Sequence, residues 1–143
     1  MKIVIGSDHG GFERKEALIS YLQDKGHEVV DVGTKSKESV NYPEFGHAAA
    51  KRVQSGECDF GILICGSGIG IGIAANKIEG IRCAMVSEPY SASLARAHNN
   101  ANMISMGARI IGEDMSKAIV DAFLSEEFEG GRHIARVEAI EAK

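Results

Sequence analysis

Short apolar runs alternate along this chain with longer segments whose apolar residues recur every three or four positions. The runs occupy residues 3–5, 29–32, 60–64, 83–86 and 103–106. The run at 60–64 is apolar on both faces of a strand, and such strands occur in parallel sheets that helices cover on both sides. The pattern therefore predicts an α/β fold, a doubly wound three-layer α/β/α sandwich around a five-stranded parallel sheet.

Turn and cap residues predict where the intervening helices begin and end. Pro43 fits the first position of one helix, which we expect to end near Gly56. Ser87 fits the cap of another helix, ending near His98. A glycine-rich turn after the third run leads into a helix that we expect to continue through about Ile78.

The 143 residues are the size of one domain, so residues 1–143 are predicted to fold as a single unit. After Gly130 and Gly131 comes a last segment with Ile134, Val137 and Ile140 on one side. A helix from about residue 131 is too short to be stable alone in water. We therefore expect it to dock on another surface, such as a second subunit.

Charge and cysteine usage exclude several classes of protein. The formal net charge of −4 argues against nucleic acid or an anionic membrane surface as partner. The apolar run at the start is too short for an export signal or a membrane span. Cys58, Cys65 and Cys83 are odd in number and lack zinc-site spacing. These features predict a cytoplasmic protein with free thiols and no metal.

The first run is followed by Asp8 and His9. In doubly wound folds ligands bind beyond the carboxyl ends of the strands, so these residues belong to the predicted ligand-binding edge. A neighbouring Asp and His can move protons near neutral pH. The equally weighted alternative is that Asp8 only caps the following helix, because Asp is a favoured cap residue.

The third run is followed by Cys65 and by glycines at alternating positions from 66 to 72. Such a loop lets its backbone N–H groups approach an anion, and the helix behind it adds a positive end that favours the Cys65 thiolate. Cys65 is therefore a candidate base or nucleophile, rather than only a small buried hydrophobe. A dinucleotide fingerprint fails because isoleucines stand at positions 71 and 73, where it requires a glycine.

Further along the chain, His98 and Asn99 could supply an acid or base and an oxyanion donor, or could simply end a helix. Arg109 follows the fifth run. Arg132 and Arg136 are four residues apart, a spacing that puts two guanidinium groups on one helix face and suits a phosphate. The alternative is that these arginines are ordinary solvated surface residues.

Taken together, these motifs resemble ribose-5-phosphate isomerase type B, a family that includes allose-6-phosphate and galactose-6-phosphate isomerases. The resemblance covers nearly the whole chain and rests on residues 7–11, 65–70, 98–102 and 131–136. Ser67 stands where the family often has Thr, and Asn100 where it often has Asp. The resemblance implies a Rossmann-like fold, an aldose–ketose isomerase without metal or cofactor, and a homodimer or tetramer with active sites between subunits.

The resemblance also implies roles for individual residues. Cys65 would move the proton between C2 and C1 of the open sugar phosphate, with Ser67 assisting at the oxygens. Asp8 and His98 would open the ring. The implied substrate-binding residues are His9, Tyr42, Gly66, Gly68, Ile69, Gly70, Asn99, Arg109, Arg132 and Arg136. His98, Asn99 and Arg109 could belong to the neighbouring chain.

Three readings of function remain open on the sequence. The first is interconversion of ribose 5-phosphate and ribulose 5-phosphate in the pentose phosphate pathway. The second is isomerisation of a hexose 6-phosphate, and the third is a non-catalytic sugar-phosphate sensor that uses the same loop and arginines. Turnover separates the enzyme from the sensor, and a panel of aldose phosphates separates the two kinds of substrate.

Overall fold

The computed structural model describes residues 1–141 and contains one five-stranded sheet, all of whose pairings are parallel. The strands lie in the order β2-β1-β3-β5-β4. Their bounds are β1 Lys2–Ser7, β2 Glu28–Asp31, β3 Phe60–Cys65, β4 Cys83–Met85 and β5 Met103–Gly107. The predicted fold class is confirmed.

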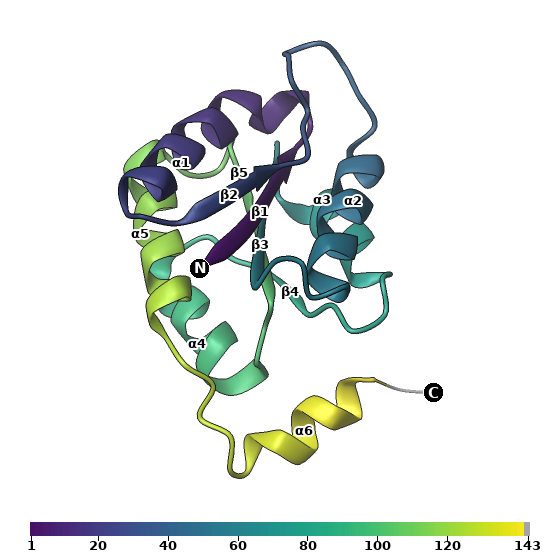
Figure 1. The fold of residues 1–143 in the computed structure, drawn as a ribbon, viewed down its shortest axis with the longest axis vertical. Helices are drawn as coiled ribbons and strands as arrows, with labels where there is room; N and C mark the ends of the chain where they lie inside the picture. Colours follow the sequence, from purple (N-terminus) through teal and green to yellow (C-terminus); the bar gives the residue numbers. More distant parts are fainter. Residues whose placement is uncertain (142–143) are drawn as a thin grey trace.

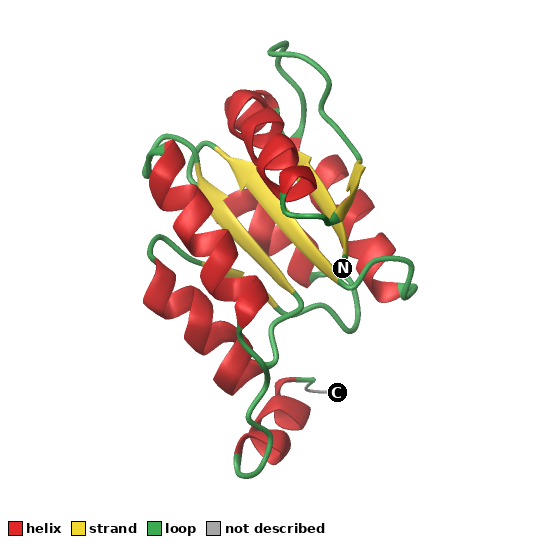
Figure 2. Cartoon of the chain, turned by 60° about the vertical axis from the view of Figure 1, so that its left-hand side comes forward, coloured by secondary structure: helices red, strands yellow, loops and turns green. Residues whose placement is uncertain are grey.

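Helices cover both faces of this sheet (Figures 1 and 2). One face packs against α1, α4 and α5, and the other against α2 and α3. The helices are α1 Phe12–Asp24, α2 Tyr42–Gln54, α3 Ile69–Asn76, α4 Pro89–Asn99, α5 Glu113–Ser125 and α6 His133–Ile140. No helix within residues 1–141 is both long and apolar enough to cross a bilayer.

The two cores follow from the alternation of side chains along the strands. In β1, Ile3 and Ile5 enter the core under α1 and α5, whereas Val4 enters the core under α2 and α3. All three side chains are fully buried. The central strands are thus apolar on both faces because both faces are covered, as a parallel sheet requires.

Three of the predicted helix boundaries are wrong by one or two residues. The helix α2 begins at Tyr42 after the cap Asn41, so Pro43 takes its second position and not its first. The cap of α4 is Glu88, whose carboxylate accepts the Ser91 N–H at 3.0–3.1 Å, and not Ser87. Pro89 takes the first helical position, which leaves residue 88 as the cap. The helix after the glycine loop ends at Asn76 and not near Ile78, because the Asn76 side chain turns to bond the backbone of Cys83.

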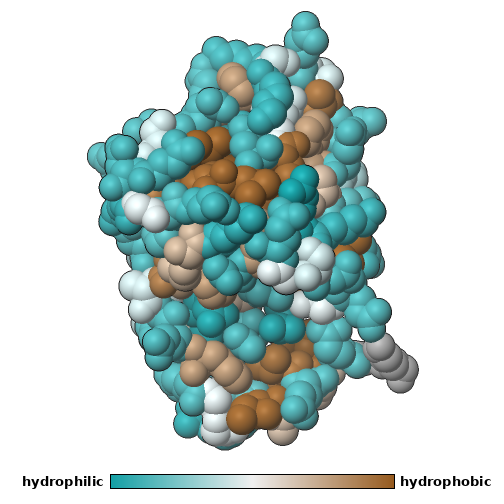
Figure 3. Space-filling model, viewed as in Figure 1, coloured by the Kyte–Doolittle hydropathy of each residue, from teal (hydrophilic) through white to brown (hydrophobic). Residues whose placement is uncertain are grey.

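The last helix, α6, stands apart from the sandwich and packs mainly against α4 (Figure 1). Of its predicted apolar side only Val137 is buried, while Ile134 and Ile140 are about half exposed at 47% and 53%. Apolar surface accordingly lies over α6 at the bottom of the space-filling view (Figure 3). The helix begins at His133, one residue later than the arginine pair requires, but Arg132 already has helical backbone angles.

Candidate active site

The loops that follow β1, β3 and β5 meet at the carboxyl edge of the sheet. The chain leaves β1 toward β2 on one side and returns to β3 on the other, so a crevice opens between the ends of β1 and β3. Two hydrogen bonds tie the β5 loop to the β3 loop, from Ala108 N to Cys65 O at 2.9 Å and from Arg109 N to Gly66 O at 3.0 Å. The sequence motifs at these three strand ends therefore form one site.

The Cys65 thiol lies at the start of α3, where backbone donors point toward it. The Gly68 N–H donates to Cys65 Sγ at 3.1 Å. Gly68 has φ 79°, and a Cβ there would lie 2.6 Å from the Met106 carbonyl carbon, so only glycine fits. The buried Ser105 hydroxyl, on β5, donates to Gly68 O at 2.7 Å and holds the turn at Gly68 in place. A backbone N–H donor and a helix N-terminus are the features that favour a thiolate in proteins, and Cys65 has both beside it.

The other two cysteines are unsuited to this chemistry. Burial raises the pKa of the Cys83 thiol to about 12, and burial likewise raises the pKa of Cys58. Both therefore stay protonated at neutral pH. Among the free thiols, Cys65 alone opens onto the cavity at the carboxyl edge within the described chain.

A cavity of about 570 Å³ extends from Cys65 along the loop, a volume within the range of small-molecule sites. Its walls come from residues that the sequence predicts and from two that it missed. The lining is Asp8, Tyr42, Cys65, Gly66, Ser67, Ile69, Gly70, Ile73, Arg109 and Ile110. Ile73 and Ile110 were missed because an exposed isoleucine carries no sequence signal for a ligand.

Two side chains of this cavity rest directly on glycines of the loop. A Cβ at Gly70 would lie 2.5 Å from the Tyr42 ring, so the ring is in contact with the loop backbone. The guanidinium of Arg109 lies over Gly66 at ordinary contact distance, since a Cβ there would be 3.4 Å from it. Arg109 thus belongs to the cavity of its own chain, and its position needs no neighbouring subunit.

Asp8 and His9 take defined orientations beside the cavity. Asp8 Oδ1 accepts the Gly11 N–H at 3.1 Å, so the cap predicted as the alternative exists, yet Asp8 also lines the cavity. Val40 N–H donates to His9 Nδ1 at 3.2 Å. In a neutral His9 the proton must then lie on Nε2, which makes this nitrogen a hydrogen-bond donor.

The remaining predicted site residues lie at the opposite edge of the sheet. His98 and Asn99 end α4, just before β5 begins, and Arg132 and Arg136 are exposed on the segment that packs against α4. Asn102 O accepts the Gly61 N–H, which aligns this end of α4 with the start of β3. Cys65 is four residues beyond Gly61, a distance of roughly 13 Å along a strand. A single copy therefore does not bring these residues to Cys65.

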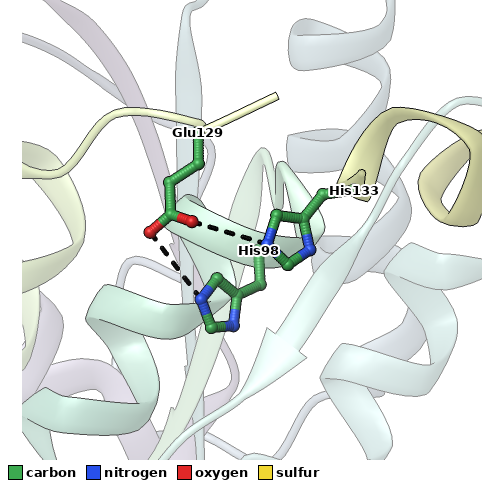
Figure 4. Close-up of side chains that lie close together, drawn as sticks. All are labelled: His98, Glu129 and His133. Carbon is green, nitrogen blue, oxygen red and sulfur yellow. Dashed lines mark ion pairs between the residues drawn. The ribbon is translucent and has the colours of Figure 1, made fainter. Parts of the chain in front are cut away.

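His98 has two close neighbours that the sequence analysis did not assign to a site. Glu129 Oε2 lies 3.7 Å from His98 Nε2, and Glu129 Oε1 lies 3.4 Å from His133 Nε2 (Figure 4). The two histidine rings stack with their centroids 4.5 Å apart. Glu129 and His133 are four residues apart, and that spacing was the available signal.

Comparison with known proteins agrees with these motifs. The model of the Ribose/Galactose Isomerase family matches residues 3–140. The ribose-5-phosphate isomerase B of Escherichia coli (strain K12) is 51% identical over 141 residues, which cover 99% of this chain and 95% of that protein. The galactose-6-phosphate isomerase subunit LacB of Clostridium acetobutylicum is 44% identical, covering 90% of this chain and 74% of that protein.

The similarity extends to the three-dimensional structure. A ribose-5-phosphate isomerase B from Clostridium thermocellum superposes with a TM-score of 0.97 at 52% identity, over 98% of this chain and 95% of that one. The resemblance inferred from the motifs is confirmed, and it favours an isomerase over a dinucleotide-dependent enzyme. The chain belongs to the ribose/galactose isomerase family and is a sugar-phosphate isomerase.

Proposed function

We propose that this protein interconverts ribose 5-phosphate and ribulose 5-phosphate, with the Cys65 thiolate as the base. The observation that carries the proposal is the Gly68 N–H donating to Cys65 Sγ at 3.1 Å, in the cavity that also holds Arg109. The name of the Escherichia coli relative supports ribose 5-phosphate as the substrate. The free cysteines support a reducing, cytoplasmic setting.

The chemistry proceeds on the open-chain sugar. Cys65 takes the proton from C2 to form an enediolate and returns it to C1, while the proton on O2 passes to O1 with help from Ser67. In this loop the Gly68 N–H donates to Cys65 Sγ and the Ile69 N–H donates to the Ser67 hydroxyl. Gly70 lies in the first turn of α3, where an N–H has no carbonyl partner four residues back, so its N–H can donate to an enediolate oxygen. A cradle of this kind, fixed before the reaction, stabilises charge without reorganising.

We further propose that a second copy completes the site with His98, Asn99, Arg132 and Arg136. A dimer whose two-fold axis lies across the strands places the carboxyl edge of one copy beside the amino edge of the other, twice. Exposed apolar side chains support this contact: Ile69 and Ile73 on α3 and Met85 on the edge strand β4 are 53%, 49% and 51% exposed. Helix α6 would then dock at this interface and aim its arginines at the phosphate.

A hexose 6-phosphate is the second candidate substrate, supported by the galactose-6-phosphate isomerase subunit among the relatives. The test is a panel of ribose, allose and galactose phosphates with the full chain after EDTA treatment, in which ketose formation is measured. We expect ribose 5-phosphate to give the largest kcat/KM without added metal. A larger value for a hexose phosphate would overturn the substrate, and binding without any ketose would leave a sensor.

A further inference from the structure

The carboxylate of Glu129 faces two stacked histidines at the amino edge of the sheet (Figure 4). Its two oxygens lie 3.7 Å from His98 Nε2 and 3.4 Å from His133 Nε2. The rings are nearly parallel, at 12°, with centroids 4.5 Å apart. The three side chains come from the end of α4, the loop after α5 and the first turn of α6.

The backbone around Glu129 is shaped to hold this group together. Glu129 N–H donates to Ala97 O at 2.9 Å, which anchors the loop on α4 next to His98. Gly130 and Gly131 then have φ values of 69° and 55°, a left-handed turn that brings His133 back over the same helix end. His133 N–H donates to Gly130 O at 3.0 Å and closes the turn.

His133 gives a second, independent indication that the group has a purpose. The residue is only 7% exposed, and its Nε2 has no hydrogen-bond partner. A buried polar atom without a partner is costly, so its position next to the Glu129 carboxylate requires an explanation. The Glu129 carboxylate oxygen Oε1 lies 3.4 Å from this nitrogen, within ion-pair distance but without the geometry of a hydrogen bond.

Ring geometry argues against a metal ion as the explanation, although two histidines and a glutamate could otherwise hold one. An imidazole binds a metal through the lone pair in its ring plane. Two stacked rings at 12° have nearly parallel planes, so no point close to both nitrogens lies in both planes. The arrangement instead suits the handling of a proton.

We propose that Glu129 and His133 are positioning residues for His98, fixing which of its nitrogens reacts. The carboxylate keeps a proton on His98 Nε2, because a negative charge at this distance favours the protonated nitrogen. The stacked His133 ring holds the plane of His98 in place. The other nitrogen, Nδ1, lies on the side of the His98 ring away from Glu129 (Figure 4). In the proposal this nitrogen meets the substrate.

The inference rests on the proposed role of His98 in opening the sugar ring. In that step the bond from C1 to the ring oxygen O4 breaks, and O4 takes the proton from His98 Nδ1. The proton on O1 passes to Asp8, and C1 and O1 become the carbonyl. His98 starts with both nitrogens protonated and ends with its proton on Nε2, beside Glu129. The Glu129 carboxylate therefore faces a protonated Nε2 both before and after His98 gives up its proton, and the His98 ring keeps the same orientation.

The test compares Glu129→Gln with Glu127→Gln, which removes an exposed carboxylate two residues earlier in the same loop. Long-range ¹H–¹⁵N spectra of the histidine rings report which nitrogen carries the proton. We expect neutral His98 to be protonated on Nε2 in the native protein and in Glu127→Gln. In Glu129→Gln a substantial fraction should shift to Nδ1. An unchanged proton position in Glu129→Gln would overturn the proposal, whether or not the protein isomerises any sugar.

Kinetic measurements on the same variants are the second test of the proposal. Glu129→Gln should lower kcat for cyclic ribose 5-phosphate roughly tenfold to a hundredfold, part of what a positioned acid contributes. Hydrogen–deuterium exchange at C1 of ribulose 5-phosphate, which is already open, should stay within about twofold of native, and Glu129→Asp should recover part of the lost kcat. Equal loss of turnover and exchange would mean structural damage and would overturn the positioning role.

His133 is tested separately from Glu129. His133→Phe keeps a flat ring for stacking but removes both nitrogens, and His133→Ala removes the ring. We expect His133→Phe to retain more than half of native kcat and His133→Ala to lose roughly tenfold. Equal losses in the two variants would show that the nitrogen matters rather than the stack, and would overturn this part of the proposal.

Discussion

The two edges of the sheet carry different kinds of functional structure. At the carboxyl edge, Cys65 lies in a loop held by backbone hydrogen bonds from the β5 loop and by Gly68, where only glycine fits. At the amino edge, His98, Glu129 and His133 are held by side-chain contacts and by one short helix that packs mainly on α4. The cavity around Cys65 is lined by residues of one chain, whereas His98 and the two arginines need a second copy to reach it.

The two edges correspond to two tasks of the proposed reaction: stabilising the enediolate, and opening the sugar ring while holding the phosphate. A cradle for an enediolate has to be rigid before the substrate arrives, and a loop fixed by its own backbone provides that rigidity. Protonation of the ring oxygen O4 and binding of the phosphate act away from C2, so groups from another copy can supply them. Variants at the carboxyl edge, at the link between the edges and at the amino edge test this division.

The largest effect is expected at the carboxyl edge. Cys65→Ala removes the proposed base, and isomerisation should fall by at least about 10³-fold, as general-base and nucleophile losses do. The measurement is ketose formation, with binding of sugar phosphate followed by calorimetry. Cys83→Ala and Cys58→Ala, at thiols that stay protonated, are the controls and should retain activity if folded. Near-native kcat in Cys65→Ala would remove the base assignment.

The link between the edges is tested by mixing two inactive variants. Cys65→Ala and His98→Asn each damage both sites of a homodimer. A mixed dimer of the two has one site that combines intact Cys65 with intact His98, if these come from different copies. After unfolding and refolding at equal amounts, half of the dimers are mixed, so about a quarter of native activity should return. No recovery, with mixed dimers present by mass spectrometry, would place both residues in a single-chain site.

The amino edge alone is tested through the phosphate. Arg136→Ala should raise KM for ribose 5-phosphate roughly tenfold to a hundredfold with a smaller fall in kcat, because a clamp binds ground and transition states alike. Arg52→Ala removes another exposed arginine, on α2, and serves as the matched control. An unchanged KM in Arg136→Ala would exclude the clamp.

Much of the carboxyl edge is predictable from sequence because its structure is local. Alternating apolar runs give the strands, parallel strands share one ligand-binding edge, and a glycine loop before a helix fixes the backbone around Cys65. The carboxylate of Asp8 caps a turn, as one of its two interpretations predicts, and also lines the cavity, while its part in proton transfer stays a prediction.

The amino edge is less predictable because it depends on where α6 folds back. The left-handed turn at Gly130 and Gly131 decides that His133 lies over His98, and no periodicity encodes that direction. The sequence predicts that this helix docks on another surface, and a single copy leaves Ile134 and Ile140 about half exposed. The prediction of the α4 cap fails for a simpler reason. Ser87 and Glu88 can both cap a helix, and the position of Pro89 decides that Glu88 does so.

The smallest expected effect concerns the free energy of unfolding and two ion pairs, one at each end of strand β2. At its carboxyl end, Asp31 Oδ2 lies 2.9 Å from the Nζ of Lys15, whose side chain is fully buried. At its amino end, Glu28 pairs with Lys2 at 3.2 Å, and both side chains are exposed. Asp31→Asn should lower the free energy of unfolding at pH 7 by about 2 kcal/mol, because it leaves a buried ammonium short of a partner. Glu28→Gln, the control, should cost less than about 0.5 kcal/mol.

The pH dependence of the Asp31 contribution follows from its pKa. Burial works to raise the pKa of Asp31, but hydrogen bonds from Lys35, Lys15 and Gly33 N–H outweigh burial and hold the pKa below its usual value of 3.8. A carboxyl with a lowered pKa in the folded state stabilises the protein fully above its unfolded pKa, and this stability is lost as pH falls through the folded pKa. Urea unfolding should therefore show the gap between native protein and Asp31→Asn at pH 7, and the gap should narrow steadily below about pH 4. A gap that stayed constant down to pH 2 would mean that Asp31 stabilises the carboxyl edge through packing and not through its charge.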